Sequence, residues 1–479
     1  MNTENNYDII VIGCGAAGLA TAIAYAEAAD RSDKIARIAL LERAPEEERG
    51  GATQWTAALL RIAEDGRFDT NWRQLVDVLG GGLPDQEYCA TLEKEVPATL
   101  EFLTSRGVPL ERLPWPAPIN FAHGEVKLQT VMHPVNGGAG IVSGLFNELT
   151  KHKGVEVHYR TEAVRLSISD DGAVNGVVVR KEDGRLRTLH GNNVMIASGG
   201  FEGNKEMLTR YLGSNACDLV PIVPGIKNNR GEGITMAIEV GADTSGQFDM
   251  FHAEAIDPRS SQPDAVVWAT PYGIVVNSDA KRFFDEGSHT LDRTFELLGY
   301  EIWKNQNQRA FWITDQQIAN LPGILAINFT DVDPIAADSI EGLAENLGLD
   351  PSALESTIAE FNSACGSQTF DHTRLDGKST TGITPPKSNW ANPIEQGPFL
   401  AVPLTGGITF TFGGIRTDTV GRVLTPAGTP IAGLYAAGEV TGLYYHEYPA
   451  ATSVLRSVTF GRLAGTHAAT CSPSRDAHS

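Results

Sequence analysis

A chain of 479 residues, 42% hydrophobic and 20% charged, is long enough for two or three globular domains. Its formal net charge of −21 disfavours nucleic acid and anionic membrane surfaces as partners. No apolar run reaches the roughly 18 residues that a membrane span needs, and the polar N-terminus lacks a secretion signal, so we expect a cytoplasmic protein. Five scattered cysteines without CxxC spacing predict neither a disulfide framework nor a metal site.

The first predicted elements are a buried parallel strand, a glycine turn and a helix in YDIIVIGCGAAGLATAIAYAEAAD. Gly13, Gly15 and Gly18 follow the dinucleotide-binding spacing, in which the glycines allow the turn, the approach of a pyrophosphate and the packing of helix on strand. Ala16 and Ala17 begin the helix, whose free N–H groups suit a phosphate. The pattern predicts a nucleotide-binding loop.

A second buried-strand pattern, KIARIALLERA, ends at Glu42 and Arg43. A carboxylate at this point accepts hydrogen bonds from both hydroxyls of an adenosine ribose and disfavours a 2′-phosphate, which leaves FAD or NAD. The glycine-rich stretch RGGATQW follows directly, and a loop there would close over the longer cofactor, which favours FAD. The alternative is a glycine turn followed by an incidental glutamate.

Near the other end, IAGLYAAGEVTG predicts a further apolar strand, and PAATSVLRSVTFGRLAG predicts a helix with small residues in its first turn. A helix N-terminus near the pyrimidine edge of a flavin would stabilise the negative charge of the reduced ring. The alternative is a buried helix start that is capped by Thr452 or Ser453.

Together with HPVNGGAGIVSGLFNEL, VMIASGGFEGN, YGIVVNSDAKRFFDEG and GGITFTFGGIRTD, these segments resemble the succinate dehydrogenase/fumarate reductase flavoprotein superfamily. The resemblance is to the soluble group that includes tricarballylate dehydrogenase. It implies an α/β fold with a Rossmann-type FAD-binding domain, formed by residues 1–235 and 390–470. An inserted α+β capping domain is implied at residues 236–389.

The resemblance also implies which residues contact FAD. Covalently flavinylated members have a histidine in the loop after the second strand, where this chain has GGATQWTAA, so we expect non-covalent FAD and no metal. The expected contacts are Gly13, Gly15, Ala16, Ala17, Gly18, Glu42, Arg43, Gly51, Ala52, Thr53, Gln54, Gly137, Gly138, Val164, Ser198, Gly199, Gly438, Glu439, Thr452, Ser453, Val454 and Leu455.

The resemblance points to three proton-transfer or substrate-binding candidates. Arg293, in KRFFDEGSHTLDRTFE, matches the region that carries the family's arginine proton shuttle, with His289 as a competitor and a surface ion pair as the alternative role for Arg293. His252 resembles the cap-side histidine that binds a substrate carboxylate, or else it caps local backbone. We expect Arg293 and Tyr448 to face each other across the substrate.

Two departures concern the substrate. Phe410 stands where fumarate reductases have a substrate-binding histidine, and Tyr448 stands where they have an arginine. We therefore expect an FAD-dependent dehydrogenase that acts on a C–C bond beside a carboxylate, as in tricarballylate. A fumarate reductase-like enoate reductase and a ketosteroid dehydrogenase-like enzyme for a cyclic ketone are the alternatives, and a redox-silent flavoprotein is a third. The electron acceptor is expected to be a separate protein or a quinone.

Overall fold

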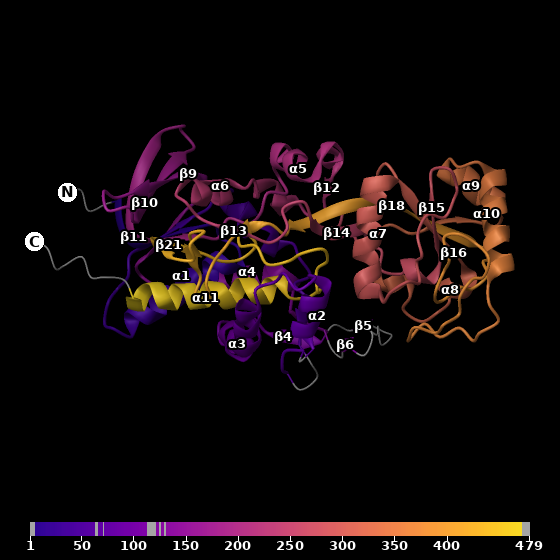
Figure 1. Cartoon of the computed structure of the whole chain (residues 1–479), viewed down its shortest axis with the longest axis horizontal. Helices are drawn as coiled ribbons and strands as arrows, with labels where there is room; N and C mark the ends of the chain where they lie inside the picture. Colours follow the sequence, from indigo (N-terminus) through magenta and orange to yellow (C-terminus); the bar gives the residue numbers. More distant parts are fainter. Residues whose placement is uncertain are drawn as a thin grey trace, which may run out of the picture.

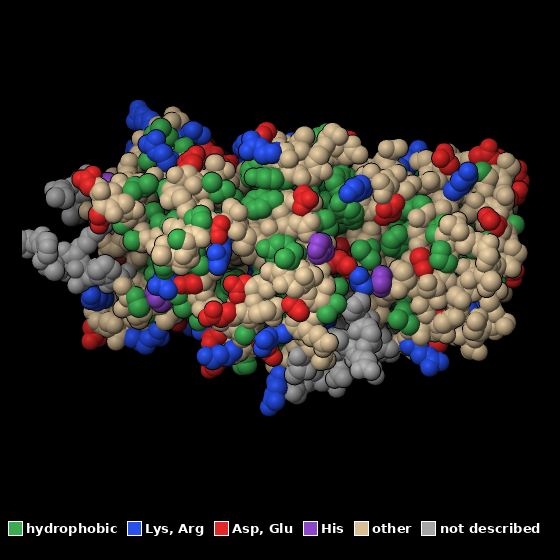
Figure 2. Space-filling view, viewed as in Figure 1, with side chains coloured by type: hydrophobic (Ala, Val, Ile, Leu, Met, Phe, Trp, Pro, Cys, Tyr) green, Lys and Arg blue, Asp and Glu red, His purple; other side chains and the backbone are tan. Residues whose placement is uncertain are grey.

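The computed structural model describes residues 5–62, 66–69, 71–112, 121–123, 126–128 and 131–471. Two bodies lie side by side along the longest axis, and strand β18 runs from one to the other (Figure 1). The larger body has both chain ends, and the smaller one has the middle of the chain. On the face that Figure 2 draws, acidic and basic side chains are interspersed over both bodies.

An eight-stranded sheet forms the centre of the larger body. The parallel strands β21, β11, β1, β2 and β8 lie in this order, so β21, from late in the chain, lies beside β11, one strand away from β1. Their buried, β-branched sequences are typical of strands covered on both faces. The strands are β1 (Asn6–Ile12), β2 (Ile38–Leu41), β8 (Val155–His158), β9 (Thr161–Ile168), β10 (Val174–Lys181), β11 (Leu186–Ile196), β20 (Arg422–Leu424) and β21 (Pro430–Ala436).

Helix α1 (Ala16–Asp30) packs against α11 (Ser453–Cys471) at very short range, and the two lie side by side in Figure 1. A Cβ at Gly461 would lie 2.4 Å from the carbonyl oxygen of Ala17, and one at Gly465 would lie 2.3 Å from that of Thr21. Thr21 Oγ1 also donates to the carbonyl of Gly461 at 3.0 Å. Glycine is therefore required at both positions of α11.

The remaining elements of this body cover the sheet or lie below α11. They are α2 (Trp72–Leu79), α3 (Gln86–Thr104), α4 (Gly137–Leu149), α5 (Lys205–Leu212), α6 (Glu232–Glu239), the pair β5 (Phe121–His123) and β6 (Val126–Leu128), the sheet of β3 (Leu60–Arg61), β4 (Leu110–Arg112) and β7 (Val131–Pro134), and the pair β13 (Thr244–Ser245) and β19 (Gly414–Ile415).

The second body is built on a six-stranded sheet around β18. Its elements are β12 (Val220–Pro221), β14 (Phe251–Ile256), β15 (Ile274–Asn277), β16 (Ala310–Asp315), β17 (Ile335–Ala337), β18 (Phe399–Thr411), α7 (Leu291–Asn305), α8 (Gln316–Ala319), α9 (Ile340–Leu347) and α10 (Pro351–Ala364). Asp350 caps α10 by accepting from the Ala353 N–H at 2.9 Å, with Pro351 as its first residue. The α/β fold with a capping domain is confirmed.

The expected domain boundaries differ from the sheet membership at three strands: β12 and β18 belong to the cap sheet, and β13 pairs with β19 in the larger body. Residues 399–404 of β18 pair with β16, and residues 405–411 pair with β14, so this strand belongs to the cap sheet although it lies within the range 390–470. Its last residues nevertheless reach the larger body, where Thr411 N donates to Glu439 at 3.1 Å. One continuous strand thus joins both bodies and has no break at a domain boundary.

We expect Gly465→Ala to lower the free energy of unfolding by about 1 to 3 kcal/mol, since the added methyl group must displace backbone of α1. Chemical denaturation followed by circular dichroism measures the change. Thr470→Ala, at an exposed position of the same helix, is the matched control and should change stability little. An unchanged Gly465→Ala midpoint would contradict the close helix contact.

Candidate active site

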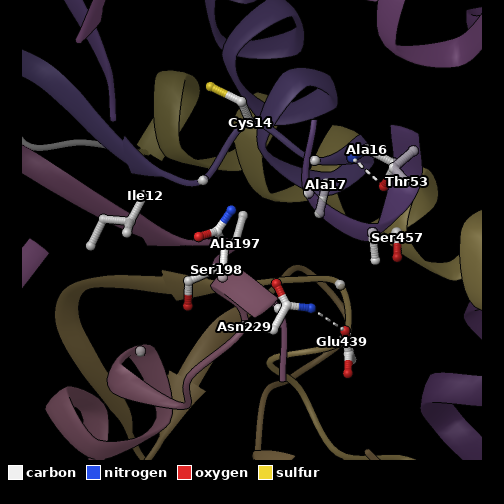
Figure 3. A pocket seen from close by; sticks show the side chains of 18 of the residues that line it. Ile12, Cys14, Ala16, Ala17, Thr53, Ala197, Ser198, Asn229, Glu439 and Ser457 are labelled. Carbon is white, nitrogen blue, oxygen red and sulfur yellow. Dashed lines mark hydrogen bonds between the residues drawn. The ribbon is translucent and has the colours of Figure 1, made fainter. Parts of the chain in front are cut away.

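A cavity in the larger body lies at the carboxyl ends of β1, β2 and β11, where open α/β sheets bind nucleotides (Figure 3). Its wall combines the β1–α1 loop, the end of β2, the short helix η3 (Gly51–Gln54), the loop after β11 and the start of α11. The lining residues that the sequence predicted are Gly13, Gly15, Ala16, Ala17, Glu42, Arg43, Gly51, Ala52, Thr53, Ser198, Gly199, Gly438, Glu439, Ser453 and Val454.

The β1–α1 loop has the geometry of a phosphate cradle. Gly13 has a φ of +106°, and a Cβ there would lie 2.3 Å from the carbonyl oxygen of Ala197. Gly15 occupies the N-cap of α1 without a side-chain cap, and the N–H of Ala16 donates to Thr53 Oγ1 at 3.1 Å (Figure 3). A helix N-terminus of this kind, open to a cavity, is suited to a diphosphate.

Glu42 lies buried at the end of β2 and lines the cavity. Burial raises the pKa of its carboxyl, and the hydrogen bond from the Ala44 N–H, 2.9 Å long, lowers it in part. The neighbouring Arg43 is held by Glu162 and Glu232 at 2.7 and 2.8 Å. Glu42 therefore keeps acceptor capacity for the hydroxyl groups of a ribose.

The opposite end of the cavity contains Glu439 and Arg456. Burial raises the pKa of Glu439 to about 7, although it accepts from the N–H of Thr411 and from Asn229 Nδ2 at 3.3 Å (Figure 3). Arg456 is buried and donates through Nη2 to the carbonyl of Gly438 at 3.2 Å, while its Nε and Nη1 have no acceptor among the described residues. Buried N–H donors in this wall suit a ligand rich in acceptors, such as the pyrimidine ring of a flavin.

Seven residues of the predicted cofactor set lie outside this wall, namely Gly18, Gln54, Gly137, Gly138, Val164, Thr452 and Leu455. Gly138 supports the wall from behind, because a Cβ there would lie 1.7 Å from the carbonyl oxygen of Thr53. Thr161 and Ala163 line the cavity from β9, so Val164 lies on the other face of the strand. Asn229, Arg456 and Ser457 line the cavity and were not predicted.

A second cavity adjoins the first, and the two share Ala52, Thr56, Thr409, Phe410, Ser453 and Val454. Aromatic side chains dominate its wall, which contains Trp268, Phe295, Phe329, Phe410 and Tyr448. The remaining lining residues are Ala57, Ala58, Leu59, Ile222, Val223, His252, Glu254, Asp264, Ala450 and Ala451. The described lining thus has no lysine or arginine, and its carboxyl groups come from Glu254 and Asp264.

His252 lies in this wall between two buried carboxylates. Its Nε2 lies 3.3 Å from Glu254 Oε1, and its Nδ1 lies 3.4 Å from Glu296 Oε1. Burial alone would lower the pKa of His252, but Glu296 and Glu254 together raise it to about 10. The imidazole is therefore a cation at neutral pH, and its charge is balanced by its own neighbours.

The other two predicted proton-transfer candidates are not in the wall. Arg293, on α7, forms a bidentate pair with Glu447, whose Oε1 lies 2.6 Å from Nη2 and whose Oε2 accepts from Nε. His289 Nδ1 lies 3.2 Å from Arg293 Nη1. The pair joins α7 of the cap to the loop before α11, so Arg293 and Tyr448 do not face each other across the cavity.

Tyr448 lines the cavity and caps α11. Its hydroxyl accepts from the N–H groups of Thr452 and Ser453, both at 2.7 Å. Thr452 Oγ1 instead contacts the hydroxyl of Tyr444 at 3.1 Å, so neither Thr452 nor Ser453 provides the cap that the sequence suggested. With both lone pairs engaged, the Tyr448 hydroxyl has its proton left to donate.

The wall also gathers residues in the left-handed conformation. Ala58, Asp264, Ala450 and Ala451 have φ values of +54°, +61°, +45° and +55°. This conformation costs an L residue roughly 1 to 2 kcal/mol, and it clusters at functional sites. Ala450 and Ala451 thereby place methyl groups at the cavity.

Comparison with known proteins shows the family. Residues 8–454 match the FAD binding domain family. The chain is 27% identical to an NADH:fumarate oxidoreductase of Klebsiella pneumoniae (strain 342), with 97% of this chain and 48% of that protein covered. It is 29% identical to a 4-oxocyclohexanecarboxylate 2-dehydrogenase of Sinomonas cyclohexanicum, with 73% and 64% covered.

The open conformation of a flavocytochrome c3 fumarate reductase has the same fold, with a TM-score of 0.77, 24% identity, and 97% of this chain and 78% of that chain covered. The chain therefore belongs to the FAD binding domain family, and it is similar in sequence to fumarate reductases, as the sequence predicted. Family and relatives assign it to the FAD-dependent oxidoreductases.

The chain spans about half the length of the first relative named above. Among the described helices, none is long and apolar enough to cross a membrane. Neither finding identifies the cellular compartment, so the cytoplasmic location stays a prediction.

We expect Glu42→Ala to weaken FAD retention, because two charge-assisted hydrogen bonds to the ribose, each worth about 1.5 to 3 kcal/mol, would be lost. The dissociation constant of FAD from the reconstituted apoprotein measures this. The matched control is Glu47→Ala, an exposed position of the nearby turn. Equal FAD affinity in Glu42→Ala and the wild type would show that Glu42 does not bind the cofactor.

Proposed function

We propose that the protein interconverts a saturated cyclic ketone and its α,β-unsaturated counterpart, with FAD held non-covalently. The observation that carries this proposal is the wall of the second cavity, which is aromatic and has no lysine or arginine in its described lining. FAD supplies hydride transfer to or from a carbon atom when it is bound. This choice corresponds to one of the alternatives left open by the sequence.

Charge argues against the tricarballylate-like substrate that the sequence favoured. Carboxylate groups need cations or several N–H donors, best as a bidentate guanidinium. The one cation of the described wall is His252, and Glu254 and Glu296 already neutralise it. A polycarboxylate would meet Glu254 and Asp264 there, and burying unpaired charge is costly. A neutral substrate avoids this cost.

We propose that Tyr448 donates a hydrogen bond to the carbonyl oxygen of the ketone substrate. The centroid of its ring lies 4.9 Å from that of Phe410 and 4.7 Å from that of His252, so the packing holds the ring in the wall. The two N–H groups at its oxygen polarise the hydroxyl, which strengthens its remaining hydrogen bond. A hydrogen bond to the carbonyl oxygen stabilises the negative charge that develops there as the neighbouring carbon loses a proton.

The name of the relative from Sinomonas cyclohexanicum includes a ring ketone, which supports this substrate class. That substrate also has a carboxylate, whereas the one cation of the described wall, His252, is already paired with Glu254 and Glu296. We therefore propose a ring ketone without an acidic group. A separate protein or a quinone remains our proposal for the electron partner.

We expect saturated cyclic ketones to bleach the oxidised flavin under anaerobic conditions, while tricarballylate and succinate leave it unchanged. The reverse reaction is followed by adding cyclic enones or fumarate to the reduced protein. Absorbance of the flavin in a stopped-flow instrument measures each reaction. Bleaching by tricarballylate but by no ketone would contradict the proposal, and no response to any acid or ketone would favour a redox-silent flavoprotein.

We expect denaturation to release intact FAD into the filtrate, because the described lining of the cofactor cavity has no histidine or tyrosine. The one cysteine in this lining is Cys14, which lies in the phosphate loop. Burial raises the pKa of the Cys14 thiol, so the thiol stays protonated and is a poor nucleophile. Ultrafiltration after denaturation, with absorbance of the filtrate, measures this. Flavin that stays with the polypeptide would contradict non-covalent binding.

A further inference from the structure

Asp264 is placed in the wall of the second cavity by a strained backbone. It lies in the loop after β14, with a φ of +61°, and its N–H donates to the carbonyl of Ile222 at 3.0 Å. The N–H of Ala57, which also lines the cavity, donates to its Oδ2 at 3.4 Å. Both contacts hold the carboxyl group in the wall although the left-handed conformation opposes it.

The partner of this carboxyl group is a second one. Asp264 and Glu254 line the same cavity, and Glu254 acts electrostatically on Asp264. The Oε2 atom of Glu254 is buried and accepts from no N–H or O–H group of the described residues. Two carboxylates in contact away from water cannot both remain charged, so one proton lies between them. Burial, and then Glu254, raise the pKa of Asp264 well above its usual range.

Glu254 is in turn the first member of a chain of buried groups. Its Oε1 faces His252, which faces Glu296 on α7, and Glu296 accepts from the N–H of Tyr448 at 3.3 Å. His252 lies between Glu254 and Glu296, at 3.3 and 3.4 Å, whereas no lysine or arginine of the described lining lies beside Asp264. The proton of the carboxyl pair is therefore held mainly by Asp264.

We propose that Asp264 is the proton-transfer residue of the substrate cavity, with Glu254 and His252 as positioning residues. The proposal rests on the proposed function. In the reductive direction, FAD held in the first cavity would supply the hydride for the carbon farther from the carbonyl group. The O–H bond of Asp264 breaks, the electron pair of the C=C bond forms a C–H bond at the carbon next to the carbonyl group, and Asp264 becomes a carboxylate.

The reverse reaction uses the same residue as a base. The carboxylate of Asp264 takes the proton from the carbon next to the carbonyl group, and the C–H electron pair forms the double bond as hydride leaves the next carbon for oxidised flavin. A carboxyl group whose proton affinity is raised is suited to both directions near neutral pH. Arg293, by contrast, is engaged with Glu447 outside this wall.

The test is enone reduction by the pre-reduced holoenzyme, measured by single-turnover flavin reoxidation between acidic and alkaline pH. The charged groups facing Asp264 are Glu254 and His252 on β14, with Glu296 of α7 beyond His252. We expect the wild-type rate to fall as pH rises through the pKa of Asp264, because the protonated form is the donor. Asp264→Asn should lose about 10²-fold or more at neutral pH and should lose this pH dependence.

Asp331→Asn, an exposed carboxyl group of the same body that binds Ser260, is the matched control and should behave like the wild type. Infrared difference spectroscopy of the resting wild type should show the C=O stretch of a buried protonated carboxyl, which Asp264→Asn removes. This readout requires no substrate and stays valid if the variant binds FAD poorly.

The outcomes separate the two proposals. If the wild-type protein reduces no cyclic enone, the proposed function is wrong, and so is the role of Asp264 as proton donor in that reaction. A reactive wild type with an equally fast Asp264→Asn variant, or with an unchanged pH profile in that variant, overturns Asp264 alone. Absence of the infrared band in the wild type at neutral pH also overturns it, since no proton would then be available.

Discussion

The close contact between α1 and α11 is the constraint on which the cofactor site depends. Ala17 lies opposite Gly461 and Thr21 lies opposite Gly465, so the helices run in the same direction and both N-termini point toward the cavity. Gly461 lies opposite Ala17, near the start of α1, but α11 begins eight residues before Gly461. At 1.5 Å per residue, the N-terminus of α11 therefore extends about 12 Å past Ala17. One helix end thus serves a diphosphate and the other serves a group farther along the same ligand.

This arrangement explains why distant parts of the chain need glycine. β21 must lie beside β11 for α11 to reach α1, and the loop between β21 and α11 must then return past the flavin end of the cavity. Gly438, with a φ of +86°, allows this turn, and a Cβ added there would lie 3.0 Å from the methyl group of Ala17. Larger residues at these positions would separate the helices and misplace both N-termini.

The sequence predicted what is local, namely the phosphate loop, Glu42, the loop at Thr53, and Glu439. Each belongs to a short motif whose strand, turn and helix fix its direction. It did not predict Asp264, Glu254 or Arg456, because their roles depend on elements far apart in the chain. Asp264 becomes part of the site only through Ala57 and β14. Arg293 instead pairs with Glu447, which precedes Tyr448. The sequence likewise did not indicate where the cap ends, because β18 runs from the cap into the larger body without a turn.

The chemistry of the second cavity comes from a few changes on a shared scaffold. Phe410 and Tyr448 contribute uncharged side chains to its wall, and Tyr448 in addition caps α11 through its hydroxyl. A nearby positive charge favours the ionised form of a buried carboxyl group. The one cation in the described wall is His252, and Glu254 and Glu296 already neutralise it. The protonated form of Asp264 is therefore favoured. The lack of lysine and arginine in the described wall and the neutral acid that we propose for Asp264 are therefore physically coupled, and together they would favour a substrate that exchanges protons without bringing charge.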